Sequence, residues 1–293
     1  MKVSGFTFVR NAVRLGYPAV ESIRSVLPLV DEFIVNVGDS QDGTLKLIRG
    51  IRDKKMKIFE TKWDERYAEK MRIFAVQTNL ALYRCAGDWC FYLQADEVVH
   101  EKGHDAIYKA MESNLGDSRV QGLLFDWIHF WADPHHFLDT YVNYRKEVRI
   151  VRNFLGVSSW LDAQSFRLDG QKLKVRPSGG TIHHYGWAMA PEKAVEKSVS
   201  HSNFYRGREK TRKRGTPGWE DFYQSVDPYF VSAFKGTHPA VMKRLVESAP
   251  IRFDPKLCKP RRNLKTLRRI LATFLWRLTG LKPGEYKNYT PIR

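Results

Sequence analysis

Two acidic residues and one amide stand where an apolar segment of the chain ends. Residues 89–93 are apolar, and Gln94, Asp96 and Glu97 follow almost directly. A carboxylate held at a strand end can bind a divalent cation through oxygen, and that cation can neutralise a departing diphosphate. The alternative is an acidic turn that caps a helix over 101–113. Taken alone, the segment fits the capping turn better, because short acidic motifs are common.

Other polar residues follow apolar segments nearer the N-terminus. Arg10 and Asn11 come after a strand predicted over 2–9, and a turn-rich loop over 38–44 comes after a strand predicted over 33–37. In open α/β sheets, ligands bind beyond the carboxyl ends of the strands. We therefore expect these loops and the residues after position 93 to meet at one binding edge.

Strands and helices alternate with short connections through the first hundred residues. Apolar positions at helical spacing predict helices beginning near Pro18, over 45–51 and over about 69–83, between strands that include 57–60 and 89–93. This alternation predicts an α/β fold with a mostly parallel sheet and helices on both faces. Neither a Walker A motif nor a GxGxxG turn follows the first strand, which disfavours a P-loop NTPase or a Rossmann dehydrogenase.

Length and composition are those of a folded protein with one large domain, or a domain and an appendage. The chain has 293 residues, of which 43% are hydrophobic and 13% aromatic. No apolar run approaches the ~20 residues that span a bilayer. Cys85, Cys90 and Cys258 are too few and too widely spaced for a disulfide framework or a cysteine zinc site. Without a secretion signal at the N-terminus, we expect a soluble, reduced, cytoplasmic protein.

The net charge of +17 belongs entirely to the second half of the chain. Residues 1–150 carry 21 basic and 21 acidic side chains, whereas residues 151–293 carry 28 and 11. Such a surplus suits nucleic acid, an anionic membrane surface or a phosphorylated substrate. No zinc-finger, homeodomain or RNA-recognition motif accompanies it, so a nucleic-acid-binding protein is the weaker alternative.

Three segments of the chain, taken in order, resemble those of family 2 glycosyltransferases. The first is F-I-V-N-V-G-D-S-Q-D-G-T over 33–44. The second runs from Asn79 through A-G-D to Q-A-D-E over 94–97. The third is T-I-H-H-Y-G-W over 181–187, followed by Pro191 and Lys193, and is similar to a segment of a bacterial branch. The resemblance covers roughly residues 3–200 and implies a GT-A fold with inverting transfer of a sugar from a nucleotide-sugar.

This resemblance also implies a division of the chain and a set of partners. A GT-A catalytic domain would occupy residues 1–200, with a nucleotide-sugar half over 1–100 and an acceptor half over 101–200. A basic, mainly helical extension would occupy residues 201–293. The implied partners are a nucleotide-sugar donor, a divalent metal (Mn²⁺ or Mg²⁺), and a glycan or lipid-linked glycan of cell-surface or lipopolysaccharide-type biosynthesis.

Residues that match the family's donor-binding motifs follow the predicted strands. Asp96 matches the metal-contacting acid, and the resemblance places His184 at the metal or the diphosphate. Gln94 stands where the family commonly has Asp, which removes a negative charge. Gln94 and His184 could instead be hydrogen-bonded strand residues, and Phe8 could belong to the core. The set implied to bind the donor is Phe8, Arg10, Asn11, Asp39, Gln94, Ala95 and Asp96.

An inverting transfer needs a base that takes the proton of the acceptor hydroxyl. Asp162 lies where the family carries its acceptor-side acid, and it is the first choice for this role. A loop Asp that makes a local turn is the alternative. Glu147, Asp133 and Asp126 are the competing carboxylates.

A basic amphipathic helix is predicted near the C-terminus, over 262–279. Its apolar positions form one stripe, while Arg261, Arg262, Arg268 and Arg269 lie mostly elsewhere. Such a helix can lie on anionic lipid, or it can pack its stripe on the domain with its charges in water. The first alternative would place the protein peripherally at the inner face of the membrane.

Two other functions stay open on the sequence. One is nucleic-acid binding through the basic half. The other is a GT-A protein that binds a nucleotide-sugar without turnover, an alternative that Gln94 keeps open.

Overall fold

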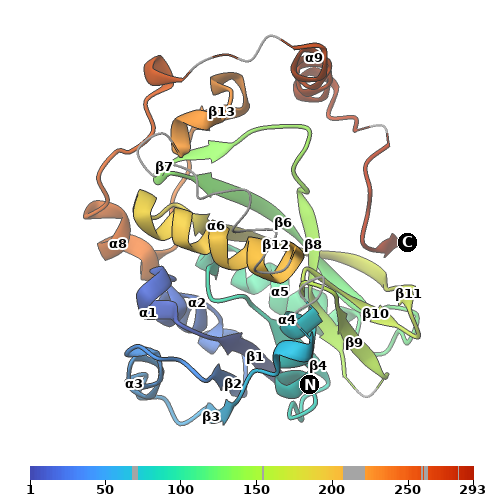
Figure 1. The fold of residues 1–293 in the computed structure, drawn as a ribbon. Coiled ribbons are helices and arrows are strands. Elements are labelled where there is room, and N and C mark those ends of the chain that lie inside the picture. The colour runs from blue at the N-terminus through green and yellow to red at the C-terminus, as the bar shows by residue number, and fades with distance from the viewer. Residues whose placement is uncertain (68–71, 154, 207–221, 259, 261–262, 283) are drawn as a thin grey trace.

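The computed structural model describes most of the chain, and Figure 1 shows it as a mixed sheet with helices packed around it. The described residues are 1–67, 72–153, 155–206, 222–258, 260, 263–282 and 284–293. Arg261 and Arg262 therefore lie outside the described residues. No helix in the described part of the chain is long and apolar enough to cross a lipid bilayer.

The first four strands form the parallel half of the main sheet. They lie in the order β3-β2-β1-β4, and each neighbouring pair is parallel. Their bounds are β1 (Val3–Val9), β2 (Glu32–Gly38), β3 (Met56–Thr61) and β4 (Trp89–Tyr92). These bounds confirm the strands predicted from apolar, β-branched runs.

Helices connect these strands, as the alternation of the sequence predicts. Their bounds are α1 (Ala12–Leu15), α2 (Ala19–Val26), α3 (Thr44–Arg49) and α4 (Arg72–Leu82). Pro18 is the N-cap of α2, which agrees with a helix start at that proline. The predicted start of α4 near residue 69 falls on residues outside the described part of the chain.

The later strands extend the sheet through both parallel and antiparallel pairings. β8 is antiparallel to β4 and β6, whereas β12 is parallel to β6 and antiparallel to β5. The bounds are β5 (Glu97–Val99), β6 (Gly122–Trp131), β7 (Asp133–Leu138), β8 (Lys146–Arg152) and β12 (Lys174–Trp187). The expected α/β class is confirmed, with the parallel pairings concentrated in the N-terminal half.

The remaining elements surround this sheet. They are α5 (His104–Ser113), α6 (Pro191–Arg206), α8 (Lys243–Glu247), α9 (Leu264–Thr279), β9 (Val157–Trp160), β10 (Ser165–Leu168), β11 (Gln171–Lys172), β13 (Val231–Ala233) and β14 (Thr290–Pro291). The helix predicted over 262–279 is α9, and α6 begins at Pro191. β13 and β14 come after residue 200 and join the main sheet. The proposed boundary at residue 200 stays a prediction.

Both faces of the sheet are buried. Successive strand residues point to opposite faces, so Phe91 packs with Phe33 in one core cluster while Tyr92 packs with Phe6 in the other. Burial on both faces fixes the register of these strands. It therefore fixes where the residues after Val9 and Tyr92 emerge.

Candidate active site

A cavity of about 280 Å³ lies beyond the carboxyl ends of β1 and β4. Seven of the residues predicted to bind donor or act in catalysis line it: Phe8, Arg10, Asn11, Gln94, Ala95, Asp96 and Asp162. Because β1 and β4 are parallel neighbours, the residues that follow them emerge at the same edge of the sheet. α6 supplies further wall residues and lies next to α1. The binding edge expected from the sequence is thus present as a cavity.

The Asp96 carboxylate is buried and paired with a lysine of α6. Lys197 Nζ donates to Asp96 Oδ2 at 2.7 Å and to the Gly186 carbonyl at 2.8 Å. The ammonium also lies 4.9 Å from the ring of Tyr17 and 5.0 Å from that of Trp187. Burial alone raises the pKa of the Asp96 carboxyl, but the charges of Lys197 and His184 outweigh it and hold the pKa well below its usual range. Asp96 is therefore ionised beside a cation that belongs to the chain.

Two histidines continue this polar network. His129 Nε2 lies 2.9 Å from the Tyr144 carbonyl, which can only accept, so this nitrogen carries the proton. Burial, and then the charge of His184, lower the pKa of His129 to about 3, so its ring is neutral at pH 7. Its Nδ1 consequently accepts from Nδ1 of His184 at 3.2 Å. The other nitrogen of His184, Nε2, lies 3.6 Å from Asp96 Oδ2.

These side chains do not fit a divalent metal in this arrangement. The Asp96 oxygen nearest to His184 is the same Oδ2 that bonds to Lys197, so a metal there would meet the ammonium. Within the residues that the structure describes, no group of three or more His, Cys, Asp or Glu side chains could hold a metal. A metal bound by Asp96 and His184 would require Lys197 to move away from Asp96 Oδ2, and the predicted metal site stays a prediction.

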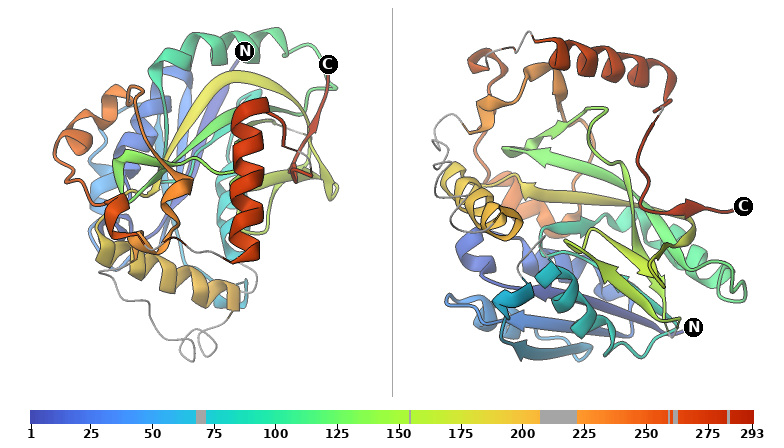
Figure 2. Two further views of the ribbon diagram at one scale, coloured as in Figure 1. Left: turned by 90° about the horizontal axis from the view of Figure 1, so that it is seen from above. Right: turned by 45° about the vertical axis from the view of Figure 1, so that its right-hand side comes forward.

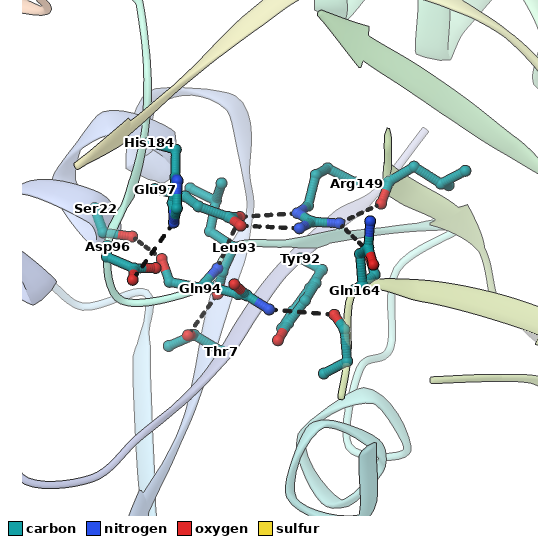
Figure 3. A network of polar contacts seen from close by, with 12 residues as sticks. Thr7, Ser22, Tyr92, Leu93, Gln94, Asp96, Glu97, Arg149, Gln164 and His184 are labelled. Atoms are coloured by element: carbon teal, nitrogen blue, oxygen red, sulfur yellow. Dashed lines mark hydrogen bonds and ion pairs between the residues drawn. The ribbon is translucent and has the colours of Figure 1, made fainter. Parts of the chain in front are cut away.

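A buried ion pair holds the Q-A-D-E turn in place. Arg149 bonds to both oxygens of the Glu97 carboxylate at 2.8 Å, and both side chains are almost inaccessible (Figure 3). Glu97 Oε2 also accepts the backbone N–H of Gln94 at 3.0 Å. The nearby Glu97 carboxylate keeps the pKa of the Arg149 guanidinium above its usual value despite burial. Glu97 thus shapes the turn that presents Gln94 and Asp96, rather than lining the cavity itself.

Arg10 and Asn11, which follow β1, contact residues of the loop that follows β2. Arg10 Nε lies 3.0 Å from Asp39 Oδ1, and its guanidinium lies 4.7 Å from the Trp63 ring. Asn11 has a left-handed backbone (φ 52°), and its side-chain oxygen accepts the N–H of Gln41 at 3.2 Å. Asp39 does not line the cavity; it contacts Arg10, which does. The loops after β1 and β2 are therefore joined as the sequence analysis expects.

Aromatic rings form one wall of the cavity. Phe8 is stacked on Phe74 with ring centres 5.7 Å apart, and Trp63 and Phe204 pack against Phe74 at 5.6 and 5.5 Å. All four residues line the cavity. Phe8 is thus both packed and in contact with the cavity, and its role in donor binding stays a prediction.

A larger cavity of about 880 Å³ adjoins the first. Tyr144, Asp162 and Gln164 line both cavities. The larger one is also lined by Arg268 and Arg269 of α9. Asp162 therefore stands where a molecule in one cavity could meet a molecule in the other.

The competing carboxylates lie in different surroundings. Glu147 lines the larger cavity, and it accepts hydrogen bonds from Gln164 at 2.9 Å and Asn288 at 3.0 Å. Burial raises the pKa of Glu147. Asp133 is fully buried and accepts the backbone N–H groups of residues 135, 252 and 253. Asp126 is exposed and paired with Lys146. Asp133 and Asp126 line neither cavity, so the structure brings only Asp162 and Glu147 to this region.

Two residues of the site, Lys197 and Arg149, do not stand out in the sequence. Lys193, which the resemblance includes, contacts the Val13 carbonyl at 3.4 Å, whereas Lys197 reaches the site. Both lysines lie on α6, and the sequence alone does not reveal which of them the packing of this helix buries. Arg149 likewise depends on a partner far away in the chain. Gly186 belongs to the segment over 181–187, but only the structure shows what surrounds it. A β-carbon on Gly186 would lie 2.6 Å from Asp96 Oδ2 and 2.8 Å from Lys197 Nζ.

Comparisons with known proteins find only distant similarity. No protein-family model matches the chain, and no curated protein matches it significantly. Among solved structures, S. aureus TarS 1-349 is 13% identical with a TM-score of 0.38, over 70% of this chain and 65% of that one. The TarS 1-349 complex with UDP-GlcNAc is 13% identical with a TM-score of 0.38, over 70% and 66%. A longer TarS structure is 13% identical with a TM-score of 0.40, over 69% and 39%. Because these TM-scores are low, the site is interpreted from its own geometry.

Proposed function

We propose that this protein is an inverting GT-A glycosyltransferase that moves a sugar from a nucleotide-sugar to a glycan or lipid-linked glycan. The observation that carries this proposal is the pair of adjoining cavities with Asp162 between them. The smaller cavity combines an aromatic wall with cationic side chains, which suits a nucleotide. The larger one is open to a second, bulkier molecule. A transferase of two substrates needs this arrangement.

The nucleotide would bind in the smaller cavity. The rings of Phe8, Trp63 and Phe74 offer apolar surface to a nucleobase, and Asn11 and Gln94 offer amide groups to the base or the ribose. Gln94 Nε2 already contacts the Ala163 carbonyl at 3.3 Å, which aims the amide along the cavity wall. Ala95 leaves space beside it because its side chain is a single methyl group.

Lys197 would neutralise charge on the diphosphate. An ammonium has three N–H groups, and two of them bond to Asp96 and the Gly186 carbonyl. The third is available to an oxygen of the donor, since Lys197 lines the cavity. In a buried site such a charge stabilises a departing nucleoside diphosphate strongly. The divalent metal implied by the resemblance has no place in this proposal, because the residues do not fit it.

Asp162 would act as the base. In the transfer, the acceptor oxygen attacks the anomeric carbon of the sugar while the bond from that carbon to the diphosphate oxygen breaks. The electron pair of that bond leaves with the nucleoside diphosphate, and the proton of the acceptor hydroxyl passes to the Asp162 carboxylate. Glu147 is less suited to this role, because it lines only the larger cavity, whereas Asp162 lines both.

A thermal-shift panel tests the donor class. UDP, GDP and dTDP, and their glucose conjugates, are each added in EDTA and in Mn²⁺. We expect at least one of them to raise the melting temperature in EDTA, because Lys197 supplies the cation. A shift only in Mn²⁺ would return the cation role to a metal. No shift with any compound would overturn the donor site.

Transfer itself is tested with the donor selected by the panel and a bacterial glycolipid extract as acceptor. Asp162→Asn is expected to bind the donor normally and to lose transfer by roughly a hundredfold or more. Glu147→Gln is the matched comparison and is expected to retain transfer. The reverse pattern would assign the base to Glu147. A donor that binds without any transfer by the wild type would instead indicate a nucleotide-sugar-binding protein.

A further inference from the structure

We infer that α9 lies on the surface of an anionic lipid bilayer through its apolar face. Six apolar side chains of this helix are between 49% and 76% exposed: Leu264, Leu267, Leu271, Phe274, Leu275 and Leu278. At 100° per residue they fall within one arc of the helix. A surface helix of a globular domain normally turns such an arc to the core. Here the arc faces outward.

Polar residues of α9 face the body of the protein instead. Thr273 is fully buried, and its hydroxyl oxygen accepts the N–H of Tyr141 at 3.2 Å. Arg277 is paired with Asp139 at 3.0 Å and donates to the Tyr229 carbonyl at 3.0 Å. Asn263 is the N-cap residue of α9, and its side-chain oxygen accepts the N–H of Thr266 at 2.9 Å. The helix is therefore anchored in this orientation by specific bonds.

The position of α9 leaves this face accessible. In Figure 1 and in the right-hand view of Figure 2 the helix lies at the outer edge of the molecule, with the other elements on one side of it. Its 16 residues span about 24 Å, which is long enough to rest along a membrane surface. Leu281, just after the helix, is also 67% exposed and extends the apolar surface.

The basic side chains of α9 favour an anionic bilayer as the partner of its apolar face. The helix contains Lys265, Arg268, Arg269 and Arg277 and no acidic residue. Lys265, Arg268 and Arg269 are exposed, and Arg268 lies directly beside the apolar arc, where it can meet anionic headgroups. A second copy of the chain is a poorer occupant, because pairing two such helices would bring like charges together.

The same helix connects the bilayer with the larger cavity. Arg268, Ala272 and Arg269 line that cavity, on the side of the helix that runs from the edge of the apolar arc toward the body of the protein. A helix resting on lipid would therefore hold the cavity at headgroup level, where an anionic lipid-linked acceptor would enter. This consequence rests on the proposed function, whereas membrane binding itself does not.

Vesicle flotation tests the inference without any nucleotide-sugar, so its failure is distinguishable from failure of the proposed activity. Phosphatidylcholine vesicles, with and without phosphatidylglycerol, are mixed with the full chain at low and high salt. We expect the wild type to float with the anionic vesicles and to bind them less in high salt. Leu267→Ser with Leu271→Ser should reduce binding at least tenfold, and Arg268→Gln should reduce it by about fivefold.

A matched control uses exposed leucines outside α9. Leu47→Ser with Leu245→Ser should leave vesicle binding unchanged, since these residues lie on α3 and α8. Circular dichroism verifies that all variants are folded, which is expected because the replaced leucines are exposed. Absence of wild-type binding, or equal binding by the Leu267 and Leu271 variant, would overturn the inference. A dimer that this variant converts to a monomer, without vesicle binding, would assign the face to a second copy.

Discussion

Lys197 places a positive charge beside the carboxylate that the sequence analysis assigned to a metal. The side chain is 3% exposed and reaches Asp96 from another element. Its two bonds and two aromatic neighbours fix the ammonium at the cavity. At the scale of single residues, the site is defined by this pair more than by any motif.

Replacement of Lys197 by methionine tests its role. Lys197→Met keeps the length of the side chain and removes the charge, so we expect the affinity for UDP in EDTA to fall about tenfold or more. Loss of one partner of a buried pair also costs about 3–5 kcal/mol of unfolding free energy. The double variant Lys197→Met with Asp96→Asn restores a neutral pair. It should recover stability but not UDP affinity, as calorimetry and denaturant titration can show; recovery of both would contradict a direct role in binding.

Gly186 provides a second test at the residue scale. Its β-carbon would lie 2.5 Å from His184 Nε2 and 2.6 Å from Asp96 Oδ2, closer than van der Waals contact permits. Gly186→Ala should therefore displace these groups and weaken UDP binding at least tenfold, with about 1–3 kcal/mol lost in stability. Gly103→Ala is the matched control, because a β-carbon there lies 3.4 Å from its nearest neighbour. Unchanged UDP binding by Gly186→Ala would show that the arrangement around Asp96 is unimportant for the nucleotide.

At the scale of elements, β12 separates two adjacent histidines. His184 faces Asp96, whereas His183 is stacked on Phe130 with ring centres 5.7 Å apart, on the opposite side of the strand. Burial, and then the charges of His100 and His238, lower the pKa of His183 to about 3. Its Nδ1 has no hydrogen-bond partner among the described residues. This histidine is part of the packing of the sheet and contributes a titratable group to it.

The position of His183 leads to a prediction about pH and stability. Its pKa is lower in the folded chain than the ordinary value of about 6.5, so between these values the unfolded chain binds the proton and the folded chain does not. Stability contributed by His183 is thus complete above the unfolded pKa and is lost as the pH falls. His183→Phe should reduce the dependence of the unfolding free energy on pH by up to about 1.4 kcal/mol per pH unit between roughly pH 6 and 4. Urea titrations at several pH values measure this dependence. The same dependence in the wild type and in the His183→Phe variant would contradict a buried, neutral histidine.

At the scale of the whole molecule, charge and site are arranged on different parts of the chain. The electrically balanced first 150 residues supply the parallel strands and most of the smaller cavity, and the basic remainder supplies Lys197, Arg268 and Arg269. The net charge of +17 is therefore not a uniform field. Lys197, Arg268 and Arg269 are among the basic side chains that line the two cavities, where a diphosphate and an anionic acceptor would be bound in the proposed function.

The sequence by itself determined the local features of this protein. Apolar runs and helical periodicity predicted β1 to β4, α2, α3, α4 and α9, because these patterns depend on neighbours in the chain. Parallel strands with polar residues at their ends predicted a binding edge, and the cavity lined by Phe8, Arg10, Asn11, Gln94 and Asp96 lies there.

Tertiary structure alone decided which distant groups meet at that edge. The ion pairs of Asp96 with Lys197 and of Glu97 with Arg149 join residues 101 and 52 positions apart, and no local pattern specifies such partners. The direction of the apolar arc of α9 was equally undetermined, because periodicity defines a stripe without saying what covers it. Bonds of Thr273 and Arg277 to the body of the protein hold that stripe outward.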